Sequence, residues 1–385
     1  MFLVSNFQSK IWMVRVLTGI GLFLLCSALS HAQIASVSVR ALLPAALSES
    51  SGGVFFNGRF ISHNDSGNEN RLYEVDTATG LILRTVHIQN AVNSDWEDLA
   101  QDATSLYIGD IGNNRGNRTD LKIYKIAKSD YLVSDTVLAE IIHYSYADQI
   151  DFTPNLNKTE WDAEALLSLD SSSLLLLTKD WVNRSTKAYS VPKQSGTYAL
   201  QPMPSQLNNA GLITGGIYDS LSGRMVLTGY NRTLMPLIWV CHSFSPQDVF
   251  SGSNQKSFLV NLMLEQTEAI AQTGPLDFLI SSESFDQGPF KDDAKLIDLQ
   301  LSAGLDLIAD AEIPSVRIYP NPVSNLLFID GGSPARVELL DMRSVRIYQG
   351  GSERMIDLSH LRKGVYLLRI TGSDGNFTQE LLIKD

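Results

Sequence analysis

The sequence predicts an all-β protein, in which a β-propeller of five blades, or of six, is followed by a small C-terminal β-sandwich. Three observations lead to this fold class. Short segments of alternating apolar and polar residues, bounded by turn residues, follow one another along most of the chain. A unit of four such segments recurs. No helix-period segment of convincing length and no glycine-rich nucleotide loop interrupts them.

The N-terminus has the features of a secretory signal peptide. Lys10 and Arg15 precede an apolar run at 16–29, and small residues follow it. The run is about 14 residues long, which is shorter than the roughly 20 that a membrane-spanning helix needs. We therefore expect residues 1–32 to be removed on export and no membrane-spanning segment to remain. Cys241 is then the one cysteine left, so no internal disulfide can form.

The remaining chain is strongly acidic. The 30 Lys and Arg residues, minus the two in the signal, stand against 42 Asp and Glu, a net charge of about −14. Such a charge excludes nucleic acid as an expected partner, because phosphate backbones bind basic surfaces. It is compatible with cations or with uncharged ligands.

The first repeat unit has the pattern of one propeller blade. Four expected strands lie at 52–56, 59–65, 71–76 and 81–88, and short turns join them. The same pattern returns along the chain in units that begin 48 to 67 residues apart, at Glu49, Glu97, Glu164, Gly215 and Glu268. The insertion at 128–159 is the longest and leaves room for a sixth blade.

The last unit lacks an outer strand. Residues 34–43 have an alternating pattern that would supply this strand, which would close the ring and remove an open sheet edge. We therefore expect a propeller domain at 34–304, followed by a linker at 305–315. A β-sandwich or a β-rich domain that does not close is the alternative.

Acidic residues recur at two positions of the unit. In a blade, the start of the innermost strand and the end of the second strand lie on the same face, near the axis. Four units place an acid at both positions, as Glu49 and Asp65, Glu97 and Asp110, Glu164 and Asp180, and Glu268 and Glu283; the fourth unit has Gly215 and Tyr230 instead. Carboxylates crowded around one axis repel each other, so something must balance their charge.

Three interpretations of this axial face stay open. The first is a structural ionic belt, because an Asn-Arg pair follows the second strand in four units and supplies Arg71, Arg115, Arg184 and Arg232. The second is a Ca2+ site, because Ca2+ takes six to eight oxygen ligands. The third is a catalytic or anion-binding cleft. The acid-free fourth unit is the natural opening for a ligand.

The segments "ESSGG", "HNDSGNENRLYEVD" and "DWEDLA" resemble parts of the phytase-like, esterase-like propeller domains. The resemblance implies that acids near the axis bind Ca2+ and that the metal assists phosphoester hydrolysis. The family's metal-binding positions correspond to Glu49, Asp65 and Glu97.

The C-terminal stretch 316–385 has a different sequence pattern. Short alternating strands are separated by turn residues, which predicts a small two-layer β-sandwich. The run Tyr319-Pro320-Asn321-Pro322 and the block that contains Gly364, Val365 and Tyr366 make this stretch similar to the type A C-terminal sorting domain of the type IX secretion system of Bacteroidota. The resemblance implies recognition by that machinery, passage through the outer membrane, and release or attachment at the cell surface.

Together these features predict an exported propeller that binds a ligand or partner at the cell surface or outside the cell. The alternative is a secreted metal-assisted hydrolase, a phosphoesterase or a glycosidase, with the acidic axial face as its site.

Overall fold

The structure of the protein is a computed structural model. It describes residues 34–385 except 209, 263, 288–289, 303–316, 332–333, 342–345 and 373–376. The predicted signal peptide and the predicted linker at 305–315 lie outside the described residues. The described chain is built of β-strands, with one short α-helix, α1 (Lys128–Val133), and one 3-10 turn, η1 (Ala45–Leu47). The all-β prediction is therefore confirmed.

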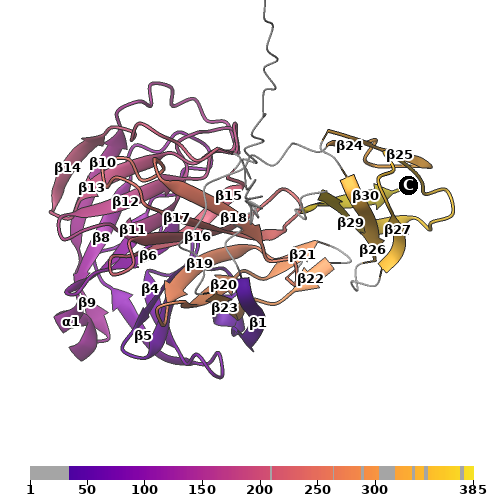
Figure 1. Cartoon of the computed structure of the whole chain (residues 1–385). Helices are drawn as coiled ribbons and strands as arrows, with labels where there is room; N and C mark the ends of the chain where they lie inside the picture. Colours follow the sequence, from indigo (N-terminus) through magenta and orange to yellow (C-terminus); the bar gives the residue numbers. More distant parts are fainter. Residues whose placement is uncertain are drawn as a thin grey trace, which may run out of the picture.

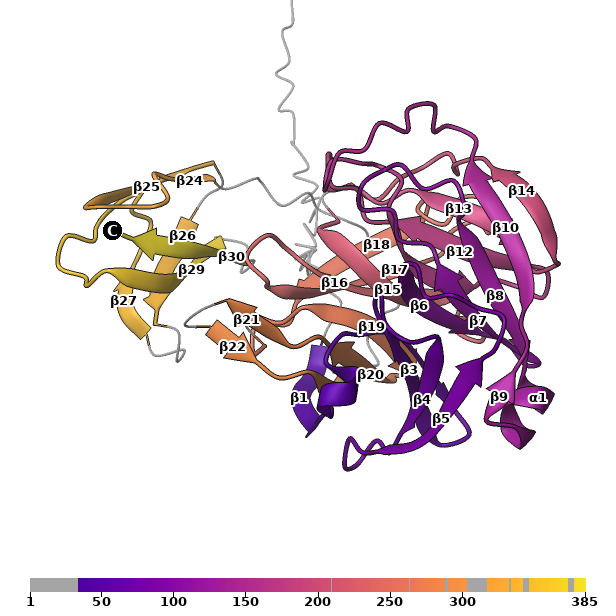
Figure 2. The same cartoon turned by 180° about the vertical axis from the view of Figure 1, so that it is seen from behind.

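Five sheets surround a common axis (Figures 1 and 2). Their innermost strands are β2 (Ser50–Phe56), β6 (Trp96–Gln101), β11 (Ala163–Ser168), β15 (Leu212–Asp219) and β19 (Thr267–Gln272). Each of these strands contacts the next one along the chain, and β19 contacts β2, so the ring is closed. This arrangement is that of a β-propeller.

The first two sheets share a connection at their outer edges. The first contains β2, β3 (Arg59–Asn64), β4 (Arg71–Val75), β5 (Ile82–Ile88) and β9 (Thr136–Val137). The second contains β6, β7 (Ser105–Asp110), β8 (Lys122–Ala127), β10 (Glu140–Tyr146) and β14 (Gly196–Leu200). The insertion at 128–159 supplies β9 and β10, so among the described residues it extends these two sheets and forms no sheet of its own.

The third and fourth sheets follow the same order from the axis outward. The third contains β11, β12 (Ser173–Thr178) and β13 (Ala188–Pro192), and its next strand, β14, crosses to pair in parallel with β10 of the second sheet. The fourth contains β15, β16 (Arg224–Tyr230), β17 (Pro236–His242) and β18 (Ser253–Phe258).

The two ends of the ring meet in the fifth sheet. It contains β19, β20 (Asp277–Ser282), β23 (Lys295–Leu301) and, from the opposite end of the domain, β1 (Ile34–Leu42). A hairpin of β21 (Phe285–Gln287) and β22 (Phe290–Asp292) lies between β20 and β23. β1 pairs antiparallel with β23 along its whole length, so the strand predicted at 34–43 covers the edge of the last sheet.

Large side chains fill the wedges between neighbouring sheets. Trp96, at the start of β6, is fully buried between the first and second sheets. Its ring contacts the rings of His63 and Tyr124, with centroids 5.4 and 6.0 Å away. No disulfide contributes, because the one cysteine of the described chain, Cys241, is a buried thiol. The stability of the ring therefore depends on apolar packing and on hydrogen bonds between sheets.

The Asp98 carboxylate connects four of the five sheets at the axis. Its oxygens accept the backbone N–H of Leu99 at 2.7 Å, within its own strand, and of Leu166 in β11 at 2.9 Å. The N–H groups of Gly53 in β2 and Gly216 in β15 also hydrogen-bond to it. Burial raises the pKa of Asp98 well above its usual range, while these four donors act in the opposite direction.

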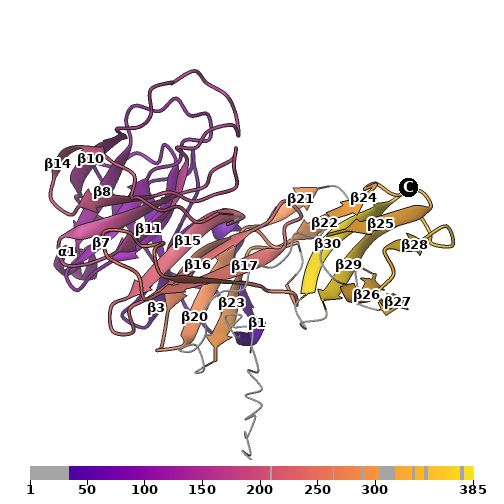
Figure 3. The same cartoon turned by 45° about the horizontal axis from the view of Figure 1, so that its top comes forward.

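The C-terminal residues form a separate two-layer sandwich, which Figure 3 shows beside the ring. One layer is β24 (Arg317–Tyr319), β25 (Leu326–Asp330) and β28 (Met355–Asp357); the other is β27 (Arg346–Gly350), β26 (Pro334–Leu340), β29 (Gly364–Gly372) and β30 (Phe377–Lys384). Leu327 and Ile329 of the first layer pack against Val337, Leu339 and Leu368 of the second. The predicted sandwich is present.

Replacing Asp98 with alanine should destabilise the propeller strongly. The change leaves buried N–H groups of four strands without an acceptor, and each such group costs about 1–3 kcal/mol. We expect Asp98→Ala to lower the free energy of unfolding by more than about 4 kcal/mol in urea titrations. The control is Asp130→Ala, at an exposed position in α1, which should change it by less than about 0.5 kcal/mol. A loss below about 1 kcal/mol for Asp98→Ala would contradict this role.

Candidate functional site: an acidic face on the propeller axis

The innermost strands share an irregularity at their start. Each has a register shift against the second strand of its sheet, at Ser50/Gly53, Trp96/Leu99, Ala163/Ala165, Ile213/Gly215 and Thr267/Ala269. Such a bulge turns a side chain away from its regular direction. In three strands the residue inside the irregularity is a glutamate: Glu97, Glu164 and Glu268. These three glutamates lie at one end of the ring, and each is at most 5 % exposed.

Three carboxylates from the first two sheets converge at this end. Asp65 directly follows β3, Asp95 directly precedes β6, and Glu97 is the second residue of β6. One ligand oxygen from each lies within 4.8 Å of the others. Gly112 faces this cluster, and a Cβ at that position would collide with the carboxylates of Glu97 and Asp95. Only a glycine at this position lets the carboxylates of Asp95 and Glu97 approach the backbone so closely.

The third sheet adds two acids and a buried lysine. Asp162 accepts the N–H of Asn113 at 2.5 Å and the indole N–H of Trp181 at 2.6 Å. Glu164 Oε1 lies 3.0 Å from Lys179 Nζ, and both side chains are almost completely buried. Burial opposes the charge of Lys179, but the surrounding carboxylates, Glu164 first among them, raise its pKa well above its usual range. Lys179 is therefore a permanent cation within the cluster.

The fifth sheet brings Glu268 and Glu283 to the same region. Burial is the main cause of the raised pKa of both, and the charge of Glu283 adds to the shift of Glu268. Glu49 is exposed at the rim, where its carboxylate accepts a hydrogen bond from Asn68 Nδ2 at 2.6 Å. Its charge contributes to the raised pKa of Asp65 and of Glu283.

The acidic cluster, which we define as Asp65, Asp95, Glu97, Asp162, Glu164, Glu268 and Glu283, carries more negative charge than Lys179 balances. Burial and mutual repulsion raise the pKa of Asp95 to about 7 and those of Glu164 and Glu283 to about 8. The pKa of Glu97 rises well above its usual range for the same reasons. Near neutral pH the cluster therefore holds protons that a cation would displace.

Two of the predicted axial acids have other partners. Asp110, fully buried, lies 2.8 Å from Arg118 and 3.1 Å from Lys122, and it accepts the N–H of Asp95. Asp180 caps the turn that follows it, because it accepts the N–H groups of Val182 and Asn183 and the hydroxyl of Ser185. Asp110 thus stabilises the segment that contains Asp95, and Asp180 stabilises the turn at 181–185.

The structure does not bring the predicted arginines to the cluster. Arg71 pairs with Glu69 at 2.8 Å, on the surface. Arg115 and Arg232 are exposed. Arg184 is partly buried, and its pKa is lowered first by burial and then by Arg232. The cations that do balance axial acids are Lys179 for Glu164, and Arg118 and Lys122 for Asp110.

The fourth sheet, as predicted, brings no acid to this face. Thr214 occupies the irregular position of β15, where its hydroxyl donates to the carbonyl of Thr267. Tyr230 ends β16, and Lys179 Nζ lies 5.5 Å from its ring centroid. This side of the cluster therefore presents hydroxyl and aromatic groups.

Three residues of the cluster were not among the predicted site residues: Asp95, Asp162 and Lys179. Asp95 and Asp162 each lie two residues before a predicted glutamate, in "DWEDLA" and "EWDAEAL", so the repetition of this short motif was an available signal. Lys179 has no comparable signal, because a lysine beside Asp180 at the end of a strand is usually solvent-exposed.

The C-terminal sandwich identifies the export route. Asn321 Oδ1 accepts the N–H of Ile383 at 2.9 Å, and this hydrogen bond ties the first turn of the sandwich to its last strand. Residues 317–384 match the secretion system C-terminal sorting domain family. This sorting domain indicates export to the cell surface or beyond, and it implies recognition by the type IX secretion machinery. The resemblance seen at Tyr319–Pro322 and Gly364–Tyr366 is thereby confirmed.

The remaining comparisons concern shape. The PQQ-bound aldose sugar dehydrogenase of Streptomyces coelicolor is similar over 71 % of this chain and 100 % of its own, at 11 % identity and a TM-score of 0.41. The extracellular domain of a hybrid two-component system of B. thetaiotaomicron is similar over 91 % of this chain and 59 % of its own, at 12 % identity and a TM-score of 0.31. Values this low say nothing about activity. No curated protein matches the sequence.

Within the described residues, no helix has the length and apolar character needed to cross a membrane.

The raised pKa values predict that the cation-free protein loses stability as pH increases. The unfolded-state pKa values of Asp95, Glu164 and Glu283 are about 4, so between about pH 4 and 8 the folded state binds more protons than the unfolded state. The stability present at low pH is therefore lost progressively between about pH 4 and 8. Calorimetry in EGTA should show a thermal midpoint that falls from about pH 5 to 8, and Glu283→Gln should flatten this fall. A thermal midpoint that stays level or rises over this pH range would contradict the raised pKa values.

Proposed function

We propose that the acidic cluster binds Ca2+, a divalent hard cation, and that the cation-loaded face binds a ligand outside the cell. The observation that carries this proposal is the convergence of Asp65, Asp95 and Glu97, with oxygens within 4.8 Å, where Gly112 lets the carboxylates of Asp95 and Glu97 lie against its backbone. Carboxylate oxygens are the ligands that hard cations prefer.

The charge of the cluster favours a cation over the other interpretations. An ionic belt would need an arginine beside each acid, whereas Arg71 pairs with Glu69 on the surface. Lys179 pairs with Glu164 at 3.0 Å. Its charge also lowers the pKa of Asp65, but burial outweighs this effect, and the pKa of Asp95 is still raised to about 7. A divalent cation held by Asp65, Asp95 and Glu97 would remove the repulsion that raises their pKa values.

The proposed ligand-binding role follows from location and from the partial exposure of Asp65 and Asp95. The sorting domain supports export, so the propeller would work where free Ca2+ is in the millimolar range, and extracellular Ca2+ sites have dissociation constants of about 10⁻⁴ to 10⁻³ M. Asp65 and Asp95 are half-buried, whereas Glu97 is buried. A ligand oxygen could therefore reach a cation held by these three acids from the side of Asp65 and Asp95.

Added Ca2+ should raise the thermal midpoint of the protein. At about 10 mM Ca2+, a site with a dissociation constant of 0.1 to 1 mM stabilises the folded state by about 1.4 to 2.7 kcal/mol, which corresponds to about 3 to 8 °C for a domain of this size. Glu97→Gln should cut this shift to below about 1 °C. Since it also removes repulsion, the same variant should melt higher than the unmodified protein in EGTA.

The matched control is Glu140→Gln, which removes an exposed acid that lies 3.5 Å from Lys125 on the outer edge of the second sheet. This variant should keep the full Ca2+ shift. Equal shifts in Glu97→Gln and Glu140→Gln would mean that Ca2+ binds elsewhere, and no shift in any protein would reject the cation site. Turnover of p-nitrophenyl phosphate or of nitrophenyl glycosides by the Ca2+-loaded protein, lost in Glu97→Gln, would replace ligand binding with the hydrolase alternative.

A further inference from the structure

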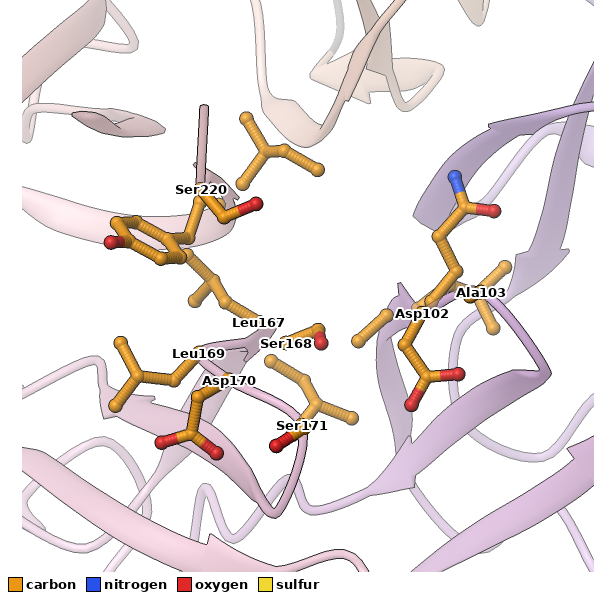
Figure 4. A pocket seen from close by; sticks show the side chains of 15 residues that line it. Asp102, Ala103, Leu167, Ser168, Leu169, Asp170, Ser171 and Ser220 are labelled. Atoms are coloured by element: carbon orange, nitrogen blue, oxygen red, sulfur yellow. The ribbon is translucent and has the colours of Figure 1, made fainter. Parts of the chain in front are cut away.

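A pocket lies at the opposite end of the ring from the acidic cluster. It has a volume of about 330 Å³ and forms where β6, β11 and β15 end and turn outward. In Figure 4, Asp102 and Ala103 lie on one side of it, and Leu169 and Asp170 lie on the facing side, with Ser168 and Ser171 between them. This volume is at the lower end of the range for small-molecule sites, about 300 to 1,000 Å³.

One wall of the pocket is held by a buried lysine whose charge is already balanced. Lys193 Nζ donates to Asp102 Oδ2 at 2.9 Å, to Ser168 Oγ at 2.8 Å and to the carbonyl of Asp170 at 2.6 Å. Asp102 also accepts the hydroxyl of Tyr107 at 2.7 Å. Neither Lys193 nor Asp102 is therefore free to attract a charged ligand, and both serve to keep the wall in place.

The hydrogen-bonding groups that face the pocket have unused capacity. Ser168 Oγ accepts from Lys193, so its own O–H hydrogen must point to another acceptor. Asp170 Oδ1 accepts from Ser172 and Ser173, whereas its Oδ2 has no partner within the described chain. The hydroxyls of Ser171 and Ser220 also make no hydrogen bond to any described residue. A ligand that both donates and accepts hydrogen bonds would satisfy this set.

An aromatic ring completes the pocket. Tyr218, at the end of β15, lines it, and its ring packs against that of Phe244 with centroids 5.9 Å apart, so the ring is supported from behind. Leu99 and Leu169 add apolar surface. A supported ring beside hydroxyls and one carboxylate suits a ligand with an apolar face and a hydroxylated edge.

We infer that this pocket binds a neutral saccharide unit, and that it is a second ligand site independent of the acidic cluster. Adjacent hydroxyls of a sugar can donate to Asp170 Oδ2 and accept from Ser168, while the C–H face of the sugar ring packs on Tyr218. An anion is disfavoured, because Asp170 is ionised and no free cation lines the pocket. An ammonium ligand is disfavoured because it has no acceptor for the Ser168 hydroxyl.

Saturation-transfer NMR on the purified full-length protein tests this inference. The probes are glucose, galactose, mannose, N-acetylglucosamine, maltose and cellobiose, with choline and inorganic phosphate as charged comparators, all at millimolar concentration in EGTA. We expect transfer from the protein to at least one saccharide. Tyr218→Ala and Asp170→Asn should each weaken its binding at least tenfold, and Asp170→Asn retains the Oδ1 acceptor that orders the turn.

Two further variants keep the result interpretable. Ser171→Trp, at an exposed position of the turn, should block the pocket without disturbing the core. Asp286→Asn removes an exposed acid that pairs with Lys291 in the β21–β22 hairpin, so it should leave saccharide binding unchanged. Because the saccharides are offered in EGTA, failure of this inference and failure of the Ca2+ proposal are distinguishable. The inference is overturned if no saccharide shows transfer, if only choline or phosphate does, or if binding survives Tyr218→Ala, Asp170→Asn and Ser171→Trp.

Discussion

The Asp98 carboxylate is the interaction on which the axis of the propeller depends. It accepts backbone N–H groups from its own strand and from β2, β11 and β15, so four of the five sheets meet at one side chain. Since no disulfide is available, this buried acceptor and the apolar wedges between the sheets hold the ring closed. Burial outweighs the four donors in setting the pKa of Asp98, but each donor would otherwise be a buried group without a partner.

The same inner strands present different chemistry at their two ends. At their starts, the irregular register turns Glu97, Glu164 and Glu268 to the axis. At their ends, the chain turns outward and leaves a pocket of hydroxyls around the ring of Tyr218. Because Asp98 and its neighbours fill the axis between these ends, we expect the two faces to bind their ligands independently.

The proposed cation site would couple folding to the environment in which the protein works. Inside the cell, where free Ca2+ is scarce, repulsion among Asp65, Asp95 and Glu97 would weaken the folded state, and their protonation would relieve it only in part. Outside the cell, a bound divalent cation would remove the repulsion. A sorting domain that directs the chain outward and a cluster that is most stable there are consistent with one another.

The sequence by itself determined the strands, the closing role of residues 34–43 and the sorting domain, because alternation, turn residues and the Tyr319–Pro322 motif are local signals. It also placed acids near the axis. Only the tertiary structure decided that Glu97 and its neighbour Asp98 have different roles, since a bulge directs one to the acidic cluster and the other to the backbone of three other strands. The sequence also could not predict that Lys179, and none of the predicted arginines, pairs with Glu164. That pairing depends on which loops the closed ring brings together.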